Sequence, residues 1–379
     1  MKTIALLFRH DLNYCRGVLR GITEYAVGRP NWTLTPVNPD RAGLRSLRAS
    51  RPSGVIAHAF DRAIDDAAGS CGCPAINVAG VLNESSMSRV CIDDRRVGAE
   101  AAAHLLSLGL RSLAFLGHPT HRYSKLREAG FARACQTAGV GIDRYMVSGS
   151  TPLGPSGVLD GLDAKLGPFL KSLSRPVGVF ACNDLWGFRL TEVCRQQGLR
   201  VPEDVAIVSV DNDDLLCLAA RPQLSSVIVP SHRIGFEAAR QLDRWIRTGK
   251  APRPEQLLHP LGVATRGSTS VLATGDALVK DAIGQMRRDL RGDVKQLCST
   301  LSVTRRSLER RFVQAMGRSP FEVITRLRID KSCELLRMTD KAVSKVAIES
   351  GFRDSKHLAS VFSRVRGQSP TAYRAAATR

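Results

Sequence analysis

Long hydrophobic runs are missing from this 379-residue sequence. The longest apolar segments, residues 4–8 and 177–182, have the length of a β-strand and fall far short of the ~18 residues that a membrane-spanning helix needs. The amino terminus has five apolar residues followed by two basic ones, and it lacks the small-residue cleavage site of a secretion signal. We therefore expect a cytoplasmic protein that has no membrane contact.

Metal-binding and disulfide patterns are also missing. The ten cysteines are scattered singly through apolar stretches, which is typical of reduced thiols in a protein core. Cys71 and Cys73 flank a glycine, but no second cysteine pair and no nearby histidine completes a zinc site. We expect neither a metal nor a cofactor.

The sequence lacks the motifs of several common enzyme classes. The first expected strand is not followed by Gly-x-Gly-x-x-Gly, and no Gly-x-x-x-x-Gly-Lys-Ser/Thr is present to bind phosphates. Neither the Gly-x-Ser-x-Gly elbow of hydrolases nor a His-Glu-x-x-His zinc motif occurs. We expect a protein that is not an enzyme; the alternative is a sugar-binding α/β enzyme with an accessory DNA-binding domain.

Positive charge is what the sequence has in excess, with a formal net charge of +20. From Gly275 onward, 22 Lys and Arg residues stand against 11 Asp and Glu residues, so the last 105 residues carry more than half of the net charge. A basic surface attracts polyanions, although a solvated basic face has the same composition. Charge alone makes nucleic acid a candidate partner.

Up to residue 265, short β-rich runs alternate with amphipathic helical stretches. The expected strands are residues 4–8, 54–58, 75–78, 90–92, 112–116, 177–181, 205–210 and 225–229. The expected helices are residues 14–27, 95–107, 124–138, 185–197 and 232–247. Such alternation predicts parallel sheets wrapped by helices. We assign residues 1–265 to an α/β domain that could consist of two similar lobes, and residues 266–276, which begin in a Thr/Gly/Ser-rich segment, to a linker.

After the linker the pattern is helical only, and it contains two helix-turn-helix units, at about 293–313 and 342–366. In the first unit Thr304 is a good N-cap, and Leu308 with Phe312 forms an apolar edge. Leu358 and Phe362 repeat this edge in the second unit. The helix expected over 320–338 would space two recognition helices along one face of a duplex.

The carboxyl-terminal region resembles the AraC/XylS family of transcription regulators. The resemblance rests on residues 304–320 and above all on residues 351–374, which include Gly367, Ser369-Pro370 and Tyr373-Arg374. It implies an all-α DNA-binding domain over residues 277–379, with two helix-turn-helix units.

Carried over position by position, this resemblance implies which side chains contact DNA. Base reading is expected from Arg306, Ser307 and Arg310 in the first unit and from Ser355, Lys356, His357 and Ser360 in the second. Arg364 also faces outward, and contacts to the phosphates are expected from Arg305, Arg311, Lys345 and Arg366. For any single arginine the alternative is an exposed, solubilising side chain.

The α/β region resembles the effector domain of LacI/GalR regulators, which has the fold of periplasmic binding proteins with two lobes. The matching segments are residues 90–94 followed by Gly98, residues 181–184, 208–213 and 224–227. LacI/GalR sequences ordinarily begin with a DNA-binding headpiece. Because the first strand is expected at the very start of this sequence, we expect DNA binding at the carboxyl end instead.

The resemblance to LacI/GalR regulators implies a ligand site between the lobes, at the carboxyl ends of the strands. Carboxylates accept hydrogen bonds from sugar hydroxyls, and Asn, Arg and His can donate to them. The expected ligand-binding residues are Asp184, Asp211, Asn212, Arg127, His10, Asp11 and Tyr14, with Asp61 and His118 as weaker candidates. For each aspartate the alternative is a helix N-cap or a turn residue.

Together these features predict a transcription regulator that binds a double-stranded DNA operator and responds to a small-molecule effector, a sugar such as xylose. We expect it to activate genes of sugar catabolism, to act as a homodimer and to contact RNA polymerase. An exported solute receptor would need a secretion signal, and it would not explain the basic carboxyl end.

Overall fold

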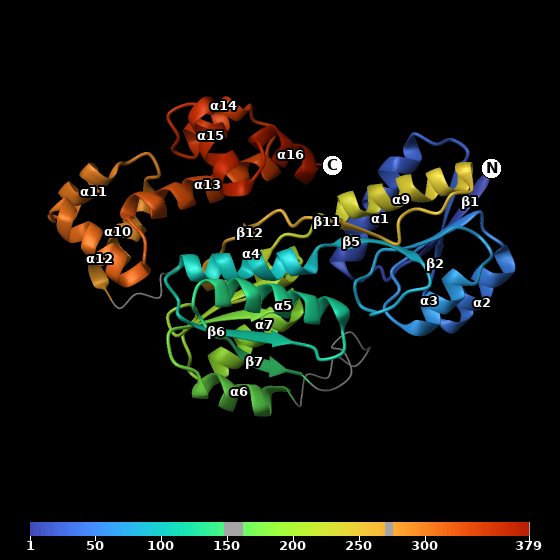
Figure 1. Cartoon of the computed structure of the whole chain (residues 1–379), viewed down its shortest axis with the longest axis horizontal. Helices are drawn as coiled ribbons and strands as arrows, with labels where there is room; N and C mark the ends of the chain where they lie inside the picture. The colour runs from blue at the N-terminus through green and yellow to red at the C-terminus, as the bar shows by residue number, and fades with distance from the viewer. Residues whose placement is uncertain (148–161, 270–275, 379) are drawn as a thin grey trace.

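The computed structural model describes residues 1–147, 162–269 and 276–378. The chain forms two α/β lobes followed by a set of helices that lies against the second lobe (Figure 1). Each lobe is built on one six-stranded sheet. The predicted fold class, a two-lobed α/β domain followed by an all-α domain, is confirmed.

The first lobe has the strand order β11-β5-β4-β3-β1-β2, and all neighbouring strands are parallel. Its strands are β1 (Lys2–Leu7), β2 (Trp32–Val37), β3 (Gly54–Ala57), β4 (Ala75–Asn77), β5 (Ser88–Ile92) and β11 (Glu255–Leu258). Its helices are α1 (Asn13–Val27), α2 (Arg41–Ser50), α3 (Arg62–Gly69) and α9 (Ser231–Thr248). Helices α1 and α9 pack so closely that a Cβ on Gly235 would lie 1.9 Å from the carbonyl oxygen of Val18.

The second lobe has the strand order β12-β10-β9-β8-β6-β7, parallel except for the antiparallel pair β10 and β12. Its strands are β6 (Ser112–Gly117), β7 (Asp143–Met146), β8 (Val177–Ala181), β9 (Val205–Val210), β10 (Ser225–Val227) and β12 (Val263–Ala264). Its helices are α4 (Asp94–Ser107), α5 (Arg122–Thr137), α6 (Leu162–Ser172), α7 (Asp184–Gln196) and α8 (Asp214–Ala219). The chain therefore passes between the lobes three times, after β5, β10 and β11.

All eight strands predicted from the sequence are present, and they are the eight interior strands of the two sheets. The four strands that the sequence did not reveal, β2, β7, β11 and β12, are the four edge strands. An interior strand is covered on both faces and forms a continuous apolar run, as β8 and β9 do. Edge strands β2 and β7 are largely exposed and carry polar residues, so their sequences resemble loops.

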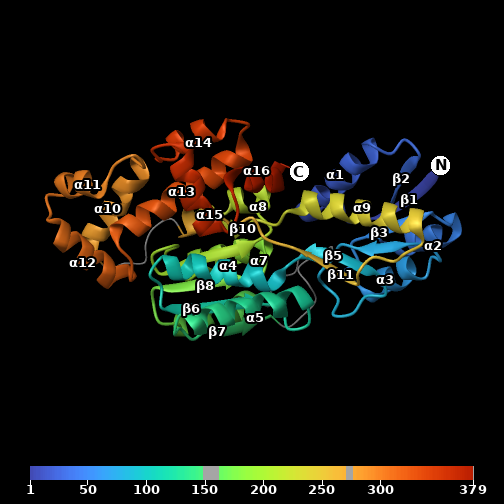
Figure 2. The same cartoon turned by 45° about the horizontal axis from the view of Figure 1, so that its top comes forward.

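The carboxyl-terminal part consists of short helices around one long helix. They are α10 (Ala277–Arg288), α11 (Val294–Thr300), α12 (Arg305–Met316), α13 (Pro320–Met338), α14 (Val343–Glu349), α15 (Ser355–Arg366) and α16 (Pro370–Thr378). The long helix α13 starts with a capping box, in which Ser319 and Glu322 satisfy each other's backbone N–H groups. It connects the two smaller clusters of helices, as Figure 2 shows.

These helices dock on the second lobe. A Cβ on Gly109, which follows α4, would lie 2.9 Å from the carbonyl oxygen of Ala315 in α12. The Tyr373 hydroxyl of α16 donates a hydrogen bond of 2.7 Å to the Leu261 carbonyl oxygen. The second lobe and the carboxyl-terminal helices are thus in direct contact.

The first residues of the linker expected over residues 266–276 belong to the second lobe. Residues Gly267–Thr269 form a 3-10 helix in which Ser268 and Thr269 are fully buried. The Ser268 hydroxyl donates to the carbonyl oxygen of Ile207 in β9, so this segment is part of the second lobe. Residues 270–275 of the predicted linker lie outside the described residues.

Candidate effector site and DNA-binding surface

Arg127 of α5 is at the centre of a cluster of charged groups where the two lobes meet. Its Nε donates a hydrogen bond of 2.8 Å to Asp94, and another of its nitrogens donates to the carbonyl oxygen of Cys182. Its Nη2 lies 4.0 Å from the Asp211 carboxylate, and its guanidinium stacks 4.9 Å from the centre of the Tyr123 ring. Only 5% of Arg127 is exposed, so its position is fixed by these contacts.

Asp94, at the start of α4, is buried, and only one of its two carboxylate oxygens has a hydrogen-bond partner among the described residues. One carboxylate oxygen binds Arg127, whereas Oδ2 is buried without a hydrogen-bond partner among the described residues. Burial raises the pKa of Asp94, and the positive charge of Arg127 opposes this effect. A buried acceptor without a partner is costly, which marks this oxygen as a candidate contact for a bound polar molecule.

The first lobe contributes Tyr14 and His58 to the same region. The Tyr14 hydroxyl donates a hydrogen bond of 2.6 Å to the Val78 carbonyl oxygen, and the charges of Asp94 and Asp211 act on this phenol. The His58 ring lies 5.7 Å from that of Tyr14, and its Nδ1 is buried with no hydrogen-bond partner. Burial and the nearby Arg9 lower the pKa of His58 to about 4, so this side chain is neutral at pH 7.

Asp184, at the start of α7, is fully engaged by its own lobe. It accepts hydrogen bonds from the hydroxyls of Ser209 and Ser226 and from the backbone N–H of Asp213. With all these partners inside the lobe, the carboxylate is well placed to hold the β9–α8 loop. The predicted direct contact with a ligand stays a prediction, and the hydrogen bonds favour a positioning role.

Asp211 and Asn212 form the β9–α8 loop in a backbone conformation that few residues adopt. Their φ angles are 110° and 54°, and Asn is among the residues that tolerate the left-handed region best. Burial, followed by the negative charges of Asp184 and Asp94, raises the pKa of Asp211, while Arg127 lowers it. The Asn212 side-chain oxygen accepts a hydrogen bond of 2.8 Å from Arg266.

His10 and Asp11 lie at the edge of this region, where the charge of Asp11 acts on His58, and their predicted contact with a ligand stays a prediction. Both are exposed, and the Asp11 carboxylate forms an ion pair with Arg9. Asp61, the weaker candidate, is the N-cap of α3 and accepts from the Ile64 N–H. These three residues thus occupy surface and cap positions.

Sequence reasoning missed Asp94 and His58. Asp94 was part of the segment that matched LacI/GalR sequences, and its position directly after a buried strand was a usable signal. His58 also follows a buried strand, where a histidine on its own is not distinctive. His118, a weaker candidate, is 6% exposed and stacks on His121 with ring centres 3.8 Å apart.

An ion pair and a backbone hydrogen bond join the two lobes beside this cluster. Arg122 of α5 lies 2.8 Å from Glu255 of β11, and the Tyr123 N–H donates a hydrogen bond of 2.9 Å to the Gly80 carbonyl oxygen. The cluster therefore combines side chains of both lobes at a point where the lobes already touch.

The first helix-turn-helix unit consists of α11 and α12. Thr304 caps α12 by accepting from the Ser307 N–H, and Leu308 and Phe312 are fully buried, as predicted. Arg306 and Arg310 are exposed and form no ion pair with another described residue. They lie four residues apart, on one face of the helix, which suits contacts to neighbouring base pairs.

Two other arginines of α12 have acidic partners. Arg305 lies 2.8 Å from Glu309 on the same helix, and Arg311 lies 3.0 Å from Asp276. Because these ion pairs are at least partly exposed, phosphates could replace the carboxylates at little cost. The predicted contacts of Arg305 and Arg311 to DNA stay predictions.

The second unit consists of α14 and α15. Asp354 caps α15 by accepting from the His357 N–H at 2.7 Å, and Leu358 and Phe362 are fully buried. The His357 ring packs edge-on against Phe352. The predicted DNA-binding residues Lys356, Ser360 and Arg364 are exposed, whereas Ser355 and His357 are half-buried.

Arg366, expected at the DNA backbone, faces the second lobe instead. Its side chain is 9% exposed and lies 3.1 Å from Asp330 of α13 and 3.7 Å from Glu100 of α4. These ion pairs leave little of the guanidinium for a phosphate in this conformation. The reason is the docking of α15 against the second lobe, which the sequence does not reveal.

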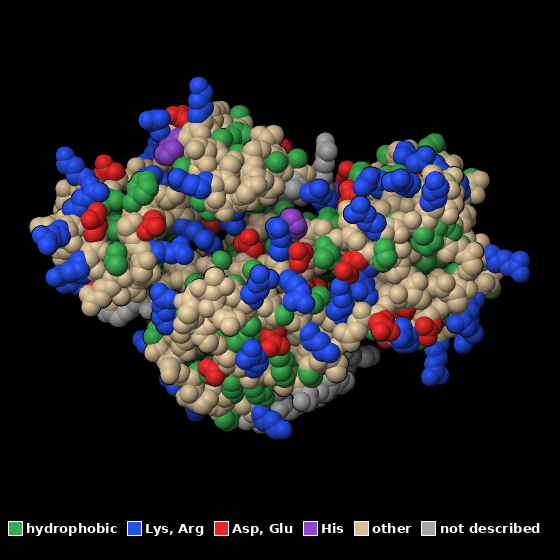
Figure 3. Space-filling view, in the orientation of Figure 1, with side chains coloured by type: hydrophobic (Ala, Val, Ile, Leu, Met, Phe, Trp, Pro, Cys, Tyr) green, Lys and Arg blue, Asp and Glu red, His purple; other side chains and the backbone are tan. Residues whose placement is uncertain are grey.

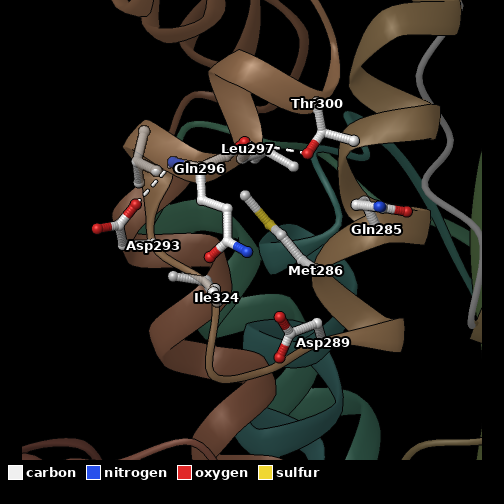
Figure 4. Close-up of a pocket in the computed structure, with 10 residues that line it drawn as sticks. Gln285, Met286, Asp289, Asp293, Gln296, Leu297, Thr300 and Ile324 are labelled. Atoms are coloured by element: carbon white, nitrogen blue, oxygen red, sulfur yellow. Dashed lines mark hydrogen bonds between the residues drawn. The ribbon is translucent and has the colours of Figure 1, made fainter.

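A small pocket between α10, α11 and α13 lies apart from these residues (Figure 4). Helix α10 and its C-cap supply Gln285, Met286 and Asp289 to the lining. Helix α11 and its N-cap supply Asp293, Gln296 and Thr300, and α13 supplies Ile324. None of the predicted ligand-binding residues lines it. Its volume of about 40 Å³ is small for a sugar.

Among the described residues, no three His, Cys, Asp or Glu side chains are grouped in a way that could hold a metal ion. In the same part of the chain, no helix combines the length and the apolar character needed to cross a membrane.

Family comparisons agree with this two-part architecture. A periplasmic binding protein-like domain matches residues 102–269, and a helix-turn-helix domain matches residues 297–376. Among solved structures, a xylose-binding transcription activator aligns over 99% of this chain and 98% of its own, with a TM-score of 0.64 and 24% identity. A ribose-bound LacI family regulator from Enterococcus faecium aligns over 70% of this chain and 98% of its own, with a TM-score of 0.57 and 25% identity.

Two curated relatives are transcription regulators. The xylose operon regulatory protein of Escherichia coli K12 is 26% identical over 98% of this chain and 96% of its own length. The HTH-type transcriptional regulator GntR of Pseudomonas aeruginosa is 32% identical over 70% of this chain and 75% of its own length. The chain therefore belongs to the transcription regulators that join a LacI/GalR-like sensor domain to an AraC-type helix-turn-helix domain.

Proposed function

We propose that this protein regulates transcription in response to a sugar that binds where the two lobes meet. The observation that supports this site most strongly is the pair of buried, unpartnered atoms, Asp94 Oδ2 and His58 Nδ1, one from each lobe. A sugar hydroxyl can donate to a carboxylate and also interact with a neutral imidazole. A molecule that satisfies both atoms at once would favour the closed arrangement of the lobes.

D-Xylose is the first candidate effector. The chain is similar over nearly its whole length to the xylose operon regulatory protein, and the related LacI family regulator holds ribose, another pentose. Arg127 binds the other oxygen of Asp94 and lies 4.0 Å from Asp211, and the charges of Asp94 and Asp211 both act on Tyr14, so these residues supply further donors and acceptors in the same region.

Operator DNA is the second partner. Arg306 and Arg310 of α12 and Lys356 and Ser360 of α15 would read bases in successive major grooves. Helix α13, with 19 residues at 1.5 Å per residue, is roughly 28 Å long, close to the ~34 Å of one duplex turn. We place the protein with the DNA in the cytoplasm, as a homodimer that activates genes of sugar catabolism through contact with RNA polymerase.

Titration calorimetry with D-xylose, D-ribose and D-glucose tests the sugar site. We expect the wild type to bind at least one of them, and Asp211→Asn to bind it at least tenfold more weakly. Asp143→Asn, an exposed aspartate on the edge strand β7, is the matched control and should bind like the wild type. If none of the sugars releases heat, or if both variants bind equally, the assignment of this site is wrong.

A further inference from the structure

A second cavity lies between the sensor and the DNA-binding helices, where the end of α4 lines it; Asp94 of the sugar site stands at the start of the same helix. His104 and Ser107 of α4 line it from the sensor. On the DNA-binding side it is lined by Arg287 of α10, Arg318 of the turn between α12 and α13, and Arg326 of α13. Figure 3 shows basic side chains gathered along the hollow between these two parts. The cavity volume is about 40 Å³. One water molecule needs roughly 10–15 Å³ by this measure, so a tetrahedral oxyanion is of suitable size.

The charges that line this cavity do not balance. Three arginines face one acid, Asp330, which is already engaged in an ion pair of 3.1 Å with Arg366. Within the described ranges, Arg287, Arg318 and Arg326 form no ion pair with an acidic side chain. The Nε of Arg287 is buried and has no hydrogen-bond partner. The cavity thus has an excess of hydrogen-bond donors and of positive charge.

The electrostatic cost is visible in the neighbouring groups. Burial lowers the pKa of Arg287 and of Arg318, and the charge of Arg326 lowers that of Arg318 further. The charge of Asp330 opposes the shift of Arg287, and that of Glu322 opposes the shift of Arg318. Burial together with Arg326, Arg366 and Arg287 lowers the pKa of His104 to about 3. Half-buried cations that outnumber the nearby acids are unfavourable, and an anion among them would reduce this repulsion.

We propose that this cavity binds a small tetrahedral oxyanion, either free phosphate or the phosphoryl group of a small metabolite. Guanidinium groups bind phosphate oxygens through paired N–H donors, and three guanidiniums can surround one such ion. Because the lining residues come from both sides, the anion would hold the DNA-binding helices against the sensor. It would therefore act on the regulator independently of which sugar binds between the lobes.

The test is the melting temperature of the full chain during titration with inorganic phosphate, with the ionic strength held constant by NaCl. We expect phosphate to raise the melting temperature of the wild type. Arg287→Gln and Arg326→Gln should each weaken the apparent phosphate affinity at least tenfold. Arg288→Gln is the matched control, because Arg288 is exposed and bonds Gln285 on the same helix.

Two further arms complete the experiment. In the first arm, the binding of glucose 6-phosphate is compared with that of phosphate and of glucose. If glucose 6-phosphate binds more tightly than phosphate, the ligand of the cavity is a phosphorylated metabolite. If it binds equally or more weakly, the ligand is the free ion. Without phosphate, the two Gln variants should melt at or above the wild-type temperature, since each removes an uncompensated cation. The proposal is overturned if phosphate acts no more strongly than NaCl, or if it stabilises the wild type and both cavity variants equally.

Discussion

Arg366, at the end of α15, lies 3.7 Å from Glu100 of α4. This ion pair connects the second recognition helix to the sensor lobe, whose sheet ends carry the proposed sugar site. The guanidinium is 9% exposed and Glu100 is half-buried, so the pair is partly shielded from solvent. It is a direct route by which a shift of α4 would be transmitted to a DNA-reading helix.

Replacing Glu100 with Gln should weaken this connection. We expect the variant to bind sugar like the wild type, because Glu100 is not part of the sugar site. The ratio of operator affinities with and without sugar should move toward one, because the variant loses the ion pair that joins the two domains. The coupling free energy between two such sites is typically about 1–3 kcal/mol in total. Fluorescence anisotropy with labelled operator measures the ratio. The control is Glu192→Gln, because Glu192 is likewise half-buried and pairs with an arginine, but on α7. An unchanged ratio in Glu100→Gln would exclude this route.

Arg310→Ala should reduce sequence-specific binding far more than binding to random DNA. An arginine that contacts guanine contributes about 1–3 kcal/mol of discrimination. Arg305→Ala serves as the comparison, because Arg305 is paired with Glu309 and is expected at a phosphate, so its loss should weaken both kinds of DNA similarly. Competition assays with both DNAs measure the two affinities. Equal losses on specific and random DNA in Arg310→Ala would remove it from the base-reading residues.

Gly351→Ala should destabilise the second helix-turn-helix unit. Gly351 has a φ of 84°, and a Cβ there would lie 2.2 Å from the Leu290 carbonyl oxygen. Gly367→Ala is the matched control: its φ is 70°, but a Cβ would meet nothing within 4 Å. The control should show only the backbone cost of about 1–2 kcal/mol. The melting temperature should therefore be highest for the wild type, lower for Gly367→Ala and lowest for Gly351→Ala. Equal melting temperatures of the two variants would show that the close contact with Leu290 is absent.

Acid should destabilise the protein partly through His104. Its folded-state pKa of about 3 lies below the usual value of 6.5, so the unfolded state takes up the proton first. Stability due to the neutral histidine is thus complete above pH 6.5 and decreases as the pH falls toward 3. Between pH 6.5 and pH 5 the effect is at most about 1.4 kcal/mol per pH unit.

We therefore expect the melting temperature of the wild type to fall more between pH 7.5 and pH 5 than that of His104→Gln. The Gln side chain keeps a hydrogen-bonding group for Thr269, the present partner of the His104 ring. If both proteins lose the same number of degrees, His104 is protonated in the folded protein over this range.

Much of the fold could be predicted from the sequence because its signals are local. Interior strands are apolar along their length, and the helix-turn-helix units have caps and apolar edges at fixed spacing. The edge strands β2, β7, β11 and β12 lacked such a pattern because they are short or only partly covered.

The site was less predictable because it depends on which groups remain unpaired after folding. Asp184 and Asp94 both follow buried strands, yet the first is satisfied within its lobe and the second keeps a free oxygen. The outward orientation expected for Arg366 is replaced by a contact between domains. Long-range docking of this kind leaves no trace in helical periodicity.

The most direct test of the account is an anisotropy titration of the full chain with a duplex selected by the protein itself from random sequences. The titration is done with and without the sugar that calorimetry identifies, for the wild type and for Asp211→Asn. The account predicts that the sugar changes the operator affinity of the wild type at least fivefold and that of Asp211→Asn hardly at all. Sugar binding that leaves the wild-type operator affinity unchanged would contradict it.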